Sequence, residues 1–244
     1  MKPVTIAAAL VYLASPVTSM AEEPRLAEYV KERTAEAGDI PATRRATLAQ
    51  LASYIRSSRD IGEPIRLTFI CTHNSRRSQM AQVWASIAAA HYGVKGFEAF
   101  SGGTEKTAFN PRAVAAHKRA GVSIEARPAV VDGENIKYAV LVPGRDKPLE
   151  CFSKVYNQPP NPVADFAAVM TCSEADRNCP NVSGAVKRIA LPYDDPKVSD
   201  GTAQEPNIYD ERCRQIAREM LYVFSLLPDS RTAPLSGSCA EPGG

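Results

Sequence analysis

Short apolar runs and longer helical patterns alternate along most of the chain. Apolar runs predict buried strands over 67–70, 97–100, 166–171 and 188–191. Apolar residues at intervals of three or four predict helices over 25–37, 42–57, 78–92, 112–120 and 207–227. Strands that alternate with helices predict an α/β fold, in which a parallel sheet is flanked by helices on both faces. Residues 22–64 then form a helical N-terminal extension.

One stretch, residues 126–160, interrupts the alternation and predicts an insertion in a domain that spans residues 65–228. Within it, segments 138–142 and 150–156 alternate between apolar and polar residues and predict a hairpin across the Pro-Gly turn at 143–146. Residues 229–244 are rich in Pro, Gly and Ser and predict a disordered tail that contains Cys239.

The composition is that of an ordinary soluble globular protein, with 44% apolar and 23% charged residues. A net charge of +2 is too small to favour nucleic acid or an anionic membrane surface as partner. The N-terminus differs from the rest: Lys2, an apolar run over 4–14 and the small-x-small sequence Ser19-Met20-Ala21 predict a signal peptide over residues 1–21. The mature protein is then periplasmic or secreted, without a membrane anchor, and is cytoplasmic if this segment is not a signal.

Candidate chemistry lies between the strand at 67–70 and the helix at 78–92, where Cys71 and Arg77 bracket a polar loop. Backbone N–H groups of a loop that enters a helix N-terminus converge on one point, and the helix dipole adds positive potential there. A tetrahedral oxyanion fits this loop, and the planar fork of Arg77 can bind two of its oxygens. The same field lowers the pKa of a cysteine and favours a thiolate nucleophile at Cys71. The alternative is a buried cysteine at a strand end beside a solvated pair of arginines.

Two further segments follow predicted strands, so the parallel sheet brings them to the same edge as Cys71. The glycines of Ser101-Gly102-Gly103-Thr104 either let the backbone approach the oxyanion loop closely or form a simple turn. In Asp194-Asp195-Pro196, a carboxylic acid above the oxyanion can protonate a leaving oxygen, or the segment is only a turn.

The remaining cysteines separate into a candidate redox pair and packing residues. Cys172 follows the strand at 166–171, and Cys179 comes after the polar stretch 173–178, which is expected to be a mobile turn. A second thiol beside an oxyanion bound to Cys71 can attack the first sulfur, after which Cys179 can reach Cys172. The alternatives are one structural disulfide or two inert thiols. Cys213 is expected in the core, Cys151 as a packed or half-buried thiol, and His117 on the surface of its helix.

At this point the motifs resemble a known family. Cys-Thr-His-Asn-Ser-Arg-Arg-Ser, Ser-Gly-Gly-Thr and the Asp-Asp-Pro loop, in this order, are similar to the low-molecular-weight protein tyrosine phosphatases. The segment Thr-Cys-Ser-Glu-Ala-Asp-Arg-Asn-Cys-Pro resembles more narrowly the thioredoxin-coupled arsenate reductases built on that fold. The resemblance covers roughly residues 66–227, and the signal, the N-terminal extension and the insertion lie outside the usual pattern.

The resemblance implies a role for each matching residue. Cys71 is the nucleophile, Arg77 the oxyanion clamp, Asp195 the general acid, and Cys172 with Cys179 the disulfide relay that a thioredoxin-like partner reduces. Asn74 and Ser78 support the loop and the thiolate, and no cofactor or metal is implied. The oxyanion-binding loop consists of Thr72, His73, Asn74, Ser75, Arg76, Arg77 and Ser78.

The implied function is the reduction of arsenate to arsenite. The alternative is a protein tyrosine phosphatase or small-molecule phosphomonoesterase that acts through a phosphocysteine, in which Cys172 and Cys179 only protect Cys71 from oxidation. Two features depart from the family pattern: His73 stands where such loops often carry a small residue, and Arg76 adds a second charge. The export signal also conflicts with a cytosolic thioredoxin, so an exported enzyme needs a periplasmic reductant.

Overall fold

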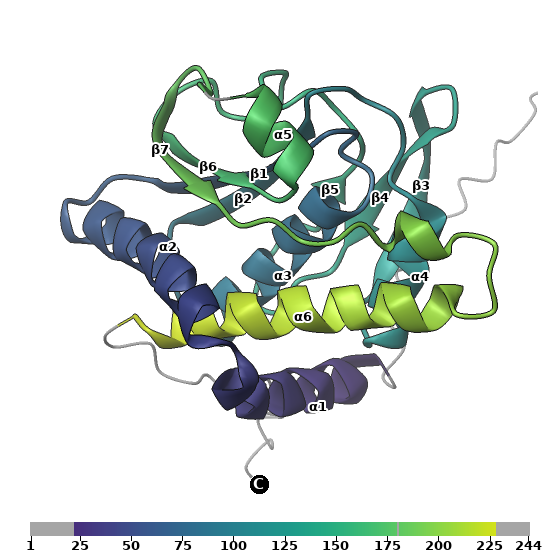
Figure 1. Ribbon diagram of the computed structural model, residues 1–244, viewed down its shortest axis with the longest axis horizontal. Helices are drawn as coiled ribbons and strands as arrows, with labels where there is room; N and C mark the ends of the chain where they lie inside the picture. Colours follow the sequence, from purple (N-terminus) through teal and green to yellow (C-terminus); the bar gives the residue numbers. More distant parts are fainter. Residues whose placement is uncertain (1–21, 180, 228–244) are drawn as a thin grey trace, which may run out of the picture.

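A four-stranded parallel sheet lies at the centre of the computed structural model, which describes residues 22–179 and 181–227 (Figure 1). The strands lie in the order β2-β1-β6-β7, and each neighbouring pair is parallel. Their carboxyl ends therefore meet at one edge, where the candidate chemistry was expected. The strands are β1 (Ile65–Cys71), β2 (Phe97–Gly103), β6 (Phe166–Met170) and β7 (Ala185–Ala190).

Helices cover both faces of this sheet, as predicted. Alternate residues of a strand point to opposite faces, so Leu67 and Phe69 enter the main core while Ile70 enters a smaller apolar cluster on the other face. The main core lies between the sheet and three helices: α2 (Ala42–Asp60), α3 (Arg77–His91) and α6 (Glu205–Ser225). The smaller cluster packs under the short helix α5 (Ser173–Asn178) (Figure 1).

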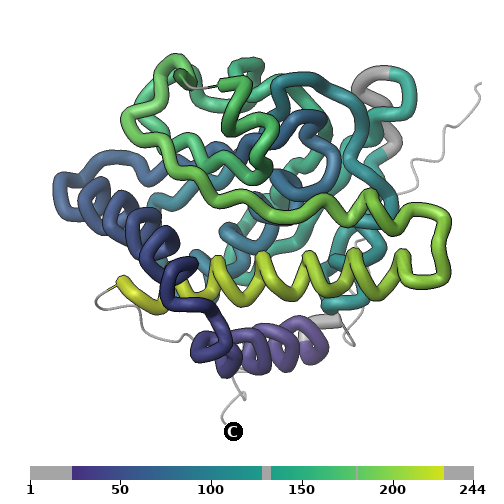
Figure 2. The backbone as a smooth tube through the Cα atoms, viewed as in Figure 1, coloured from purple at the N-terminus to yellow at the C-terminus, as the bar shows by residue number. Residues whose placement is uncertain are grey.

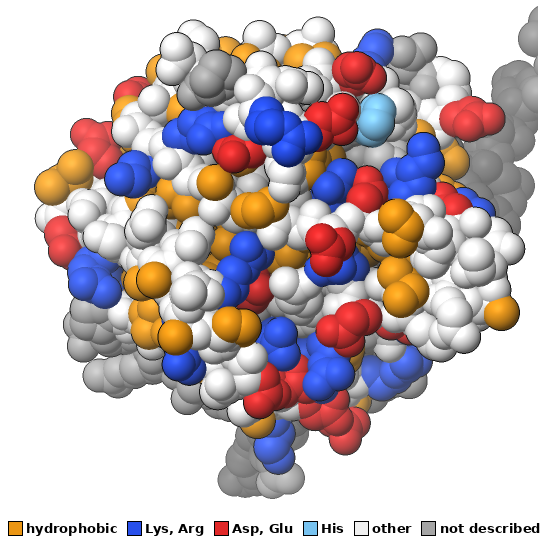
Figure 3. Space-filling model, in the orientation of Figure 1, with side chains coloured by type: hydrophobic (Ala, Val, Ile, Leu, Met, Phe, Trp, Pro, Cys, Tyr) orange, Lys and Arg blue, Asp and Glu red, His pale blue; other side chains and the backbone are white. Residues whose placement is uncertain are grey.

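The N-terminal extension is helical, as predicted, and consists of α1 (Glu22–Ala35), the 3₁₀ turn η1 (Glu36–Asp39) and α2. Helix α1 runs alongside α6 in the backbone trace (Figure 2). Acidic and basic side chains mingle on the surface over these two helices (Figure 3). An ion pair joins Arg214 of α6 to Glu36 of η1 at 2.6 Å, and Arg44 of α2 binds the buried Glu219 through its Nε and Nη2. The extension is thus packed onto the C-terminal helix.

The insertion forms a separate antiparallel sheet of β3 (Ile124–Asp132), β4 (Asn135–Val140) and β5 (Leu149–Cys151). The predicted hairpin is present as the β4–β5 pair, but β5 ends at Cys151 rather than at residue 156. Strand β3 was not expected. Pro128 interrupts its apolar pattern, and the register against β4 shifts between Ala126 and Val130, where a proline can be accommodated.

Two local predictions were wrong. Residues 173–178 form helix α5 instead of a mobile turn, because Cys172 Sγ accepts a hydrogen bond from Ala175 N at 3.3 Å and caps the first turn. His117, on α4 (Pro111–Arg119), is fully buried between Trp84 and Phe109 instead of exposed. Burial lowers the pKa of His117 to about 4, so its imidazole is neutral at pH 7.

Two predictions concern residues that the structure does not describe. They are the signal peptide over 1–21 and the disordered tail over 229–244, which contains Cys239. Within the described part of the chain, none of the helices combines the length and the apolar character that crossing a bilayer requires.

Candidate active site

The candidate site begins where β1 ends at Cys71 and α3 begins at Arg77. The thiol of Cys71 is only 3% exposed, and its sulfur lies 3.0 Å from Ser78 Oγ in the first turn of α3. A sulfur at a strand end that faces the N-terminus of a long helix sits in the positive potential of that helix. The local strand, loop and helix that the sequence predicted are therefore present, with both bracketing residues in place.

Asn74 organises the middle of this loop. Its backbone has a φ of 46°, in the left-handed region that Asn tolerates better than most residues. Its Nδ2 donates to Ser78 Oγ at 2.8 Å, so the hydroxyl proton of Ser78 is free to point at Cys71 Sγ. A hydrogen bond from that hydroxyl stabilises negative charge on the sulfur when Cys71 acts as a nucleophile. Asn74 and Ser78 thus have the contacts that their expected supporting roles require.

The glycines after β2 allow a close backbone approach, which decides between the two alternatives left open by the sequence. A Cβ at Gly103 would lie 2.6 Å from Thr72 O and 2.8 Å from Asn74 N, both in the oxyanion loop. Real Cβ atoms do not approach backbone atoms this closely, so only glycine lets β2 lie against the loop. The segment is therefore more than a turn.

A second support comes from the insertion and was missed by the sequence analysis. Ser153 Oγ donates to His73 O at 3.0 Å, and Lys154 N donates to Asn74 Oδ1 at 3.0 Å. Asn135 holds Ser153 in turn, because its amide pairs with both the N–H and the C=O of Ser153 at 2.9 and 2.7 Å. The two contacts with the loop each join residues that are 80 positions apart, and no local sequence pattern predicts them.

Arg77 and Asp195 face each other across the mouth of the loop. Arg77 Nη2 donates to Asp195 Oδ2 at 2.6 Å, and Nη1 donates to Tyr193 O at 3.1 Å. Asp195 Oδ1 also accepts the N–H of Lys197 and so caps the start of the 3₁₀ turn η2 (Pro196–Ser199). Asp194 points the other way, since its side chain is 96% exposed. Of the two candidate acids, Asp195 is the one that lies at the site.

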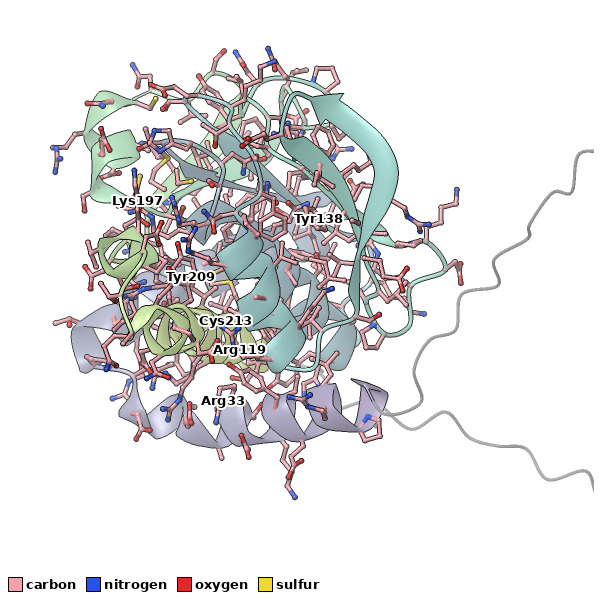
Figure 4. All side chains as sticks on the ribbon, turned by 90° about the vertical axis from the view of Figure 1, so that its right-hand side faces the viewer. Arg33, Arg119, Tyr138, Lys197, Tyr209 and Cys213 are labelled. Carbon is pink, nitrogen blue, oxygen red and sulfur yellow. The ribbon has the colours of Figure 1, made fainter. Side chains whose placement is uncertain are left out.

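The side chain of Arg76 is used for anchoring. Its Nε donates to Tyr209 Oη at 2.8 Å, and Tyr209 Oη donates to Asp200 Oδ1 at 2.7 Å. Figure 4 shows Tyr209 on α6 close to η2, which carries Lys197. Arg76 therefore ties the oxyanion loop to the segment that follows Asp195.

His73 and Ser75 lie on the outer side of the loop. Together they border an open hollow of about 460 Å³. The start of α4, Glu134 of the insertion and Lys197 also line this hollow. His73 Nε2 lies 3.7 Å from Glu105 Oε2, and its side chain is 43% exposed. These two loop residues therefore face the space beside the oxyanion position.

The candidate redox cysteines lie next to the loop. Cys172 is fully buried, and its sulfur lies 3.5 Å from Thr72 Oγ1. Cys71 and Cys172 share the smaller apolar cluster, and Cys179 packs against it at the other end of α5. The five cysteines of the described residues are free thiols. The two sulfurs that the relay requires beside Cys71 are therefore on its side of the molecule.

The other described cysteines are separate from this arrangement. Burial raises the pKa of the Cys151 thiol and of the Cys213 thiol to about 12, so both stay protonated. Trp84 Nε1 donates to Cys213 Sγ at 3.2 Å, which is the packing role that was expected. Among residues 22–179 and 181–227, His, Cys, Asp and Glu side chains do not gather in a group that could hold a metal ion.

Comparison with known proteins finds related sequences. A family model described as low molecular weight phosphotyrosine protein phosphatase matches residues 66–142. The arsenate reductase of Bacillus subtilis strain 168 is 30% identical over 158 residues, which cover 64% of this chain and 92% of that protein. The arsenate reductase of Staphylococcus aureus strain Newman is 34% identical over 130 residues, covering 52% of this chain and 76% of that protein.

Among solved structures, a low molecular weight protein tyrosine phosphatase from T. tengcongensis gives a TM-score of 0.44 at 16% identity. The match covers 67% of this chain and 99% of that one. The family model contains the oxyanion loop and ends before Ser153. Ser153 and Lys154, which donate hydrogen bonds to the loop, therefore lie outside the part of the chain that the family model matches.

Proposed function

This chain belongs to the low-molecular-weight phosphotyrosine phosphatase family, and from that membership we propose that it reduces arsenate to arsenite through Cys71, Cys172 and Cys179. It is an enzyme with arsenate reductase or phosphatase activity. The observation that carries the proposal is the buried thiol of Cys172, 3.5 Å from the hydroxyl of Thr72 in the oxyanion loop. A phosphatase has no chemical need for this second sulfur, whereas a reductase does.

The first step is attack of the Cys71 thiolate on the arsenic atom. A sulfur–arsenic bond forms, and one arsenate oxygen leaves as water after Asp195 has given it a proton. Arg77 holds two of the remaining oxygens, together with backbone N–H groups of the loop. Before substrate arrives, Arg77 is bound to Asp195. The incoming oxyanion replaces Asp195 as the partner of the guanidinium, and Asp195 is then free to act as the acid.

The next steps transfer electrons from sulfur to arsenic. The Cys172 thiolate attacks Cys71 Sγ, and a disulfide forms as the sulfur–arsenic bond breaks. The electron pair of the broken bond stays on arsenic, which becomes arsenite, while the two sulfurs are oxidised. Cys179 then attacks Cys172 Sγ and returns Cys71 as a thiolate. An external dithiol of the thioredoxin type reduces the Cys172–Cys179 disulfide.

Helix α5 has to unwind for the last exchange. Cys172 and Cys179 cap opposite ends of this six-residue helix. At about 1.5 Å per residue, a helix of this size keeps its ends about 9 Å apart. A disulfide requires Cα atoms within roughly 4.4–6.8 Å of each other. The relay therefore includes a local helix-to-loop transition, instead of the mobile turn that the sequence suggested.

The relay is tested by the Cys179→Ser variant. We expect it to complete one turnover of arsenate and then stop, because Cys71 stays trapped in a disulfide with Cys172. Hydrolysis of an aryl phosphate, which uses only the oxyanion loop and Asp195, is expected to stay within about twofold of wild type. The measurement is arsenite released per enzyme with thioredoxin present, compared side by side with aryl phosphate turnover.

Cys239→Ser is the matched control and should behave as wild type in both assays. Sustained arsenate turnover by Cys179→Ser would remove this residue from the mechanism. If wild type turns over aryl phosphate but not arsenate, the reductase proposal itself is wrong.

One observation favours the alternative, a phosphomonoesterase. His73, Ser75 and Arg76 of the loop border a hollow of about 460 Å³, which offers room beside the oxyanion loop for the alcohol of a phosphate ester. In that case the Cys71 thiolate displaces the alcohol, which Asp195 protonates, and water then hydrolyses the phosphocysteine. The comparison of the two substrates described above decides which activity dominates.

Export is a further part of the proposal, and it determines which reductant the enzyme meets. Residues 1–21 have the basic start, apolar run and small-residue ending of a signal peptide. We expect the mature protein to begin at Glu22 and to be recovered from the periplasm or medium, with a periplasmic dithiol as its reductant. N-terminal sequencing of the fractionated protein is the measurement, and an intact Met1 on cytoplasmic protein would contradict export.

A further inference from the structure

We infer that Arg188 is a positioning residue that holds helix α5 closed and thereby sets how fast Cys179 reaches Cys172. The inference rests on the proposed function, because it assigns a control point to the same disulfide relay. It concerns a residue on β7 outside the oxyanion loop and outside the cysteine pair.

Arg188 binds the C-terminal end of α5 through three hydrogen bonds. Its Nη2 donates to Asp176 O at 2.6 Å and to Asp176 Oδ1 at 2.5 Å, and its Nε donates to Cys179 O at 3.2 Å. Carbonyl groups in the last turn of a helix have no partner within that helix, so an external donor stabilises this end. The backbone of Arg188 is itself held in the sheet, because Arg188 of β7 pairs with Ala168 of β6.

The two ends of α5 are held by different means. At the N-terminal end the cap is the sulfur of Cys172, which accepts the N–H of Ala175. That sulfur is also the one that attacks Cys71, and in a disulfide it is a poorer acceptor than as a thiolate. Formation of the first disulfide therefore weakens the N-terminal cap. The hydrogen bonds of Arg188 still stabilise the C-terminal end of α5.

Opening of α5 removes these contacts, since its last turn has to leave the guanidinium for Cys179 to approach Cys172. Two of the three acceptors belong to Asp176, whose side chain is 30% exposed, and one is the carbonyl of Cys179 itself. Cys179 can therefore approach Cys172 only after its hydrogen bond with Arg188 has broken. Arg188 thus slows the exchange and keeps the two thiols apart in the resting enzyme.

The test measures the opening of α5 without substrate. In a Cys71→Ser background, diamide oxidises Cys172 and Cys179 to a disulfide by taking up two electrons and two protons from the thiols. We expect Arg188→Ala, which removes all three hydrogen bonds, to form this disulfide at least about tenfold faster, since one charge-assisted hydrogen bond alone is worth about that factor. Arg188→Lys should restore part of the slow rate, because an ammonium can still bind one carbonyl.

Lys187→Ala is the matched control, since Lys187 is an exposed neighbour on the same strand and should leave the rate unchanged. If Arg188→Ala does not fold, Asp176→Ala removes the same ion pair from the helix side and is expected to accelerate oxidation as well. A rate within twofold of the parent in both variants would overturn the inference.

A second arm separates this inference from the proposed function. With Cys71 intact, arsenate should produce the Cys172–Cys179 disulfide in a single turnover, while aryl phosphate hydrolysis is the same with and without Arg188→Ala. If diamide oxidation is accelerated but arsenate never produces the disulfide in wild type, the proposed reductase fails and the role of Arg188 on α5 stands. If arsenate produces it and Arg188→Ala has no effect in either arm, only the inference fails.

Discussion

Replacing Cys71 by serine is expected to abolish both arsenate reduction and aryl phosphate hydrolysis, with a loss of roughly 10⁴-fold or more. Cys71 Sγ faces the N-terminus of α3 and lies 3.0 Å from the hydroxyl of Ser78, and both stabilise negative charge on an attacking sulfur. An alcohol in the same place stays protonated near neutral pH and is a far weaker nucleophile than a thiolate. Steady-state rates with both substrates, at matched enzyme concentrations, provide the measurement.

The control for this variant is oxyanion binding. Because Arg77 and the loop amides remain, Cys71→Ser should still bind phosphate, which is detected as a rise in melting temperature. Cys151→Ser, at a buried thiol that the mechanism does not use, is expected to retain activity. Activity of Cys71→Ser above one hundredth of wild type, or loss of phosphate binding together with activity, would mean that the sulfur is not the nucleophile or that the loop has collapsed.

Replacing Asp195 by asparagine is expected to lower the rate by about 10²- to 10⁴-fold with a poor leaving group such as phenolate. The amide cannot donate the acidic proton that the leaving oxygen needs. With 2,4-dinitrophenolate, which leaves without protonation, the loss should be much smaller. The measurement is kcat for both esters, and this dependence on the leaving group separates an acid from a residue that only shapes the site.

The same variant is expected to bind phosphate more tightly, by up to about fivefold, because the oxyanion no longer competes with a carboxylate for Arg77. In wild type, that carboxylate lies 2.6 Å from Arg77 Nη2 and occupies the fork. Inhibition constants for phosphate measure this effect. Asp194→Asn is the matched control, since its exposed side chain points away from the site, and an equal loss in both variants would exclude the assigned role of Asp195.

Where the sequence analysis succeeded, the relevant contacts are local. Cys71 and Ser78 are seven residues apart, and Asn74 reaches Ser78 four residues on, so strand, loop and helix propensities nearly suffice to place them. Where it failed, contacts from distant segments intervened. His117 is buried because neighbouring helices cover α4, and its own helix carries no sign of that cover.

The stretch between Cys172 and Cys179 is a second case in which contacts in the folded structure overrode the local sequence pattern. Polar residues such as Ser173, Asp176 and Asn178 are common in turns, which made a mobile turn the natural expectation. The sulfur cap at one end and Arg188 at the other stabilise a helix instead. Neither contact follows from helix propensity, and both matter for how the cysteines are separated.

The order of residues by itself determined the parallel α/β arrangement and the oxyanion loop between β1 and α3, because hydrophobic periodicity and the spacing of Cys71 and Arg77 act over short distances. The tertiary structure alone decided which carboxylate faces Arg77, that Arg76 points to Tyr209, and that Ser153 braces the loop from 80 residues away. The physical reason is that hydrogen bonds and burial between distant segments depend on how the chain packs, and a linear pattern does not encode which of several equivalent polar residues will face inward.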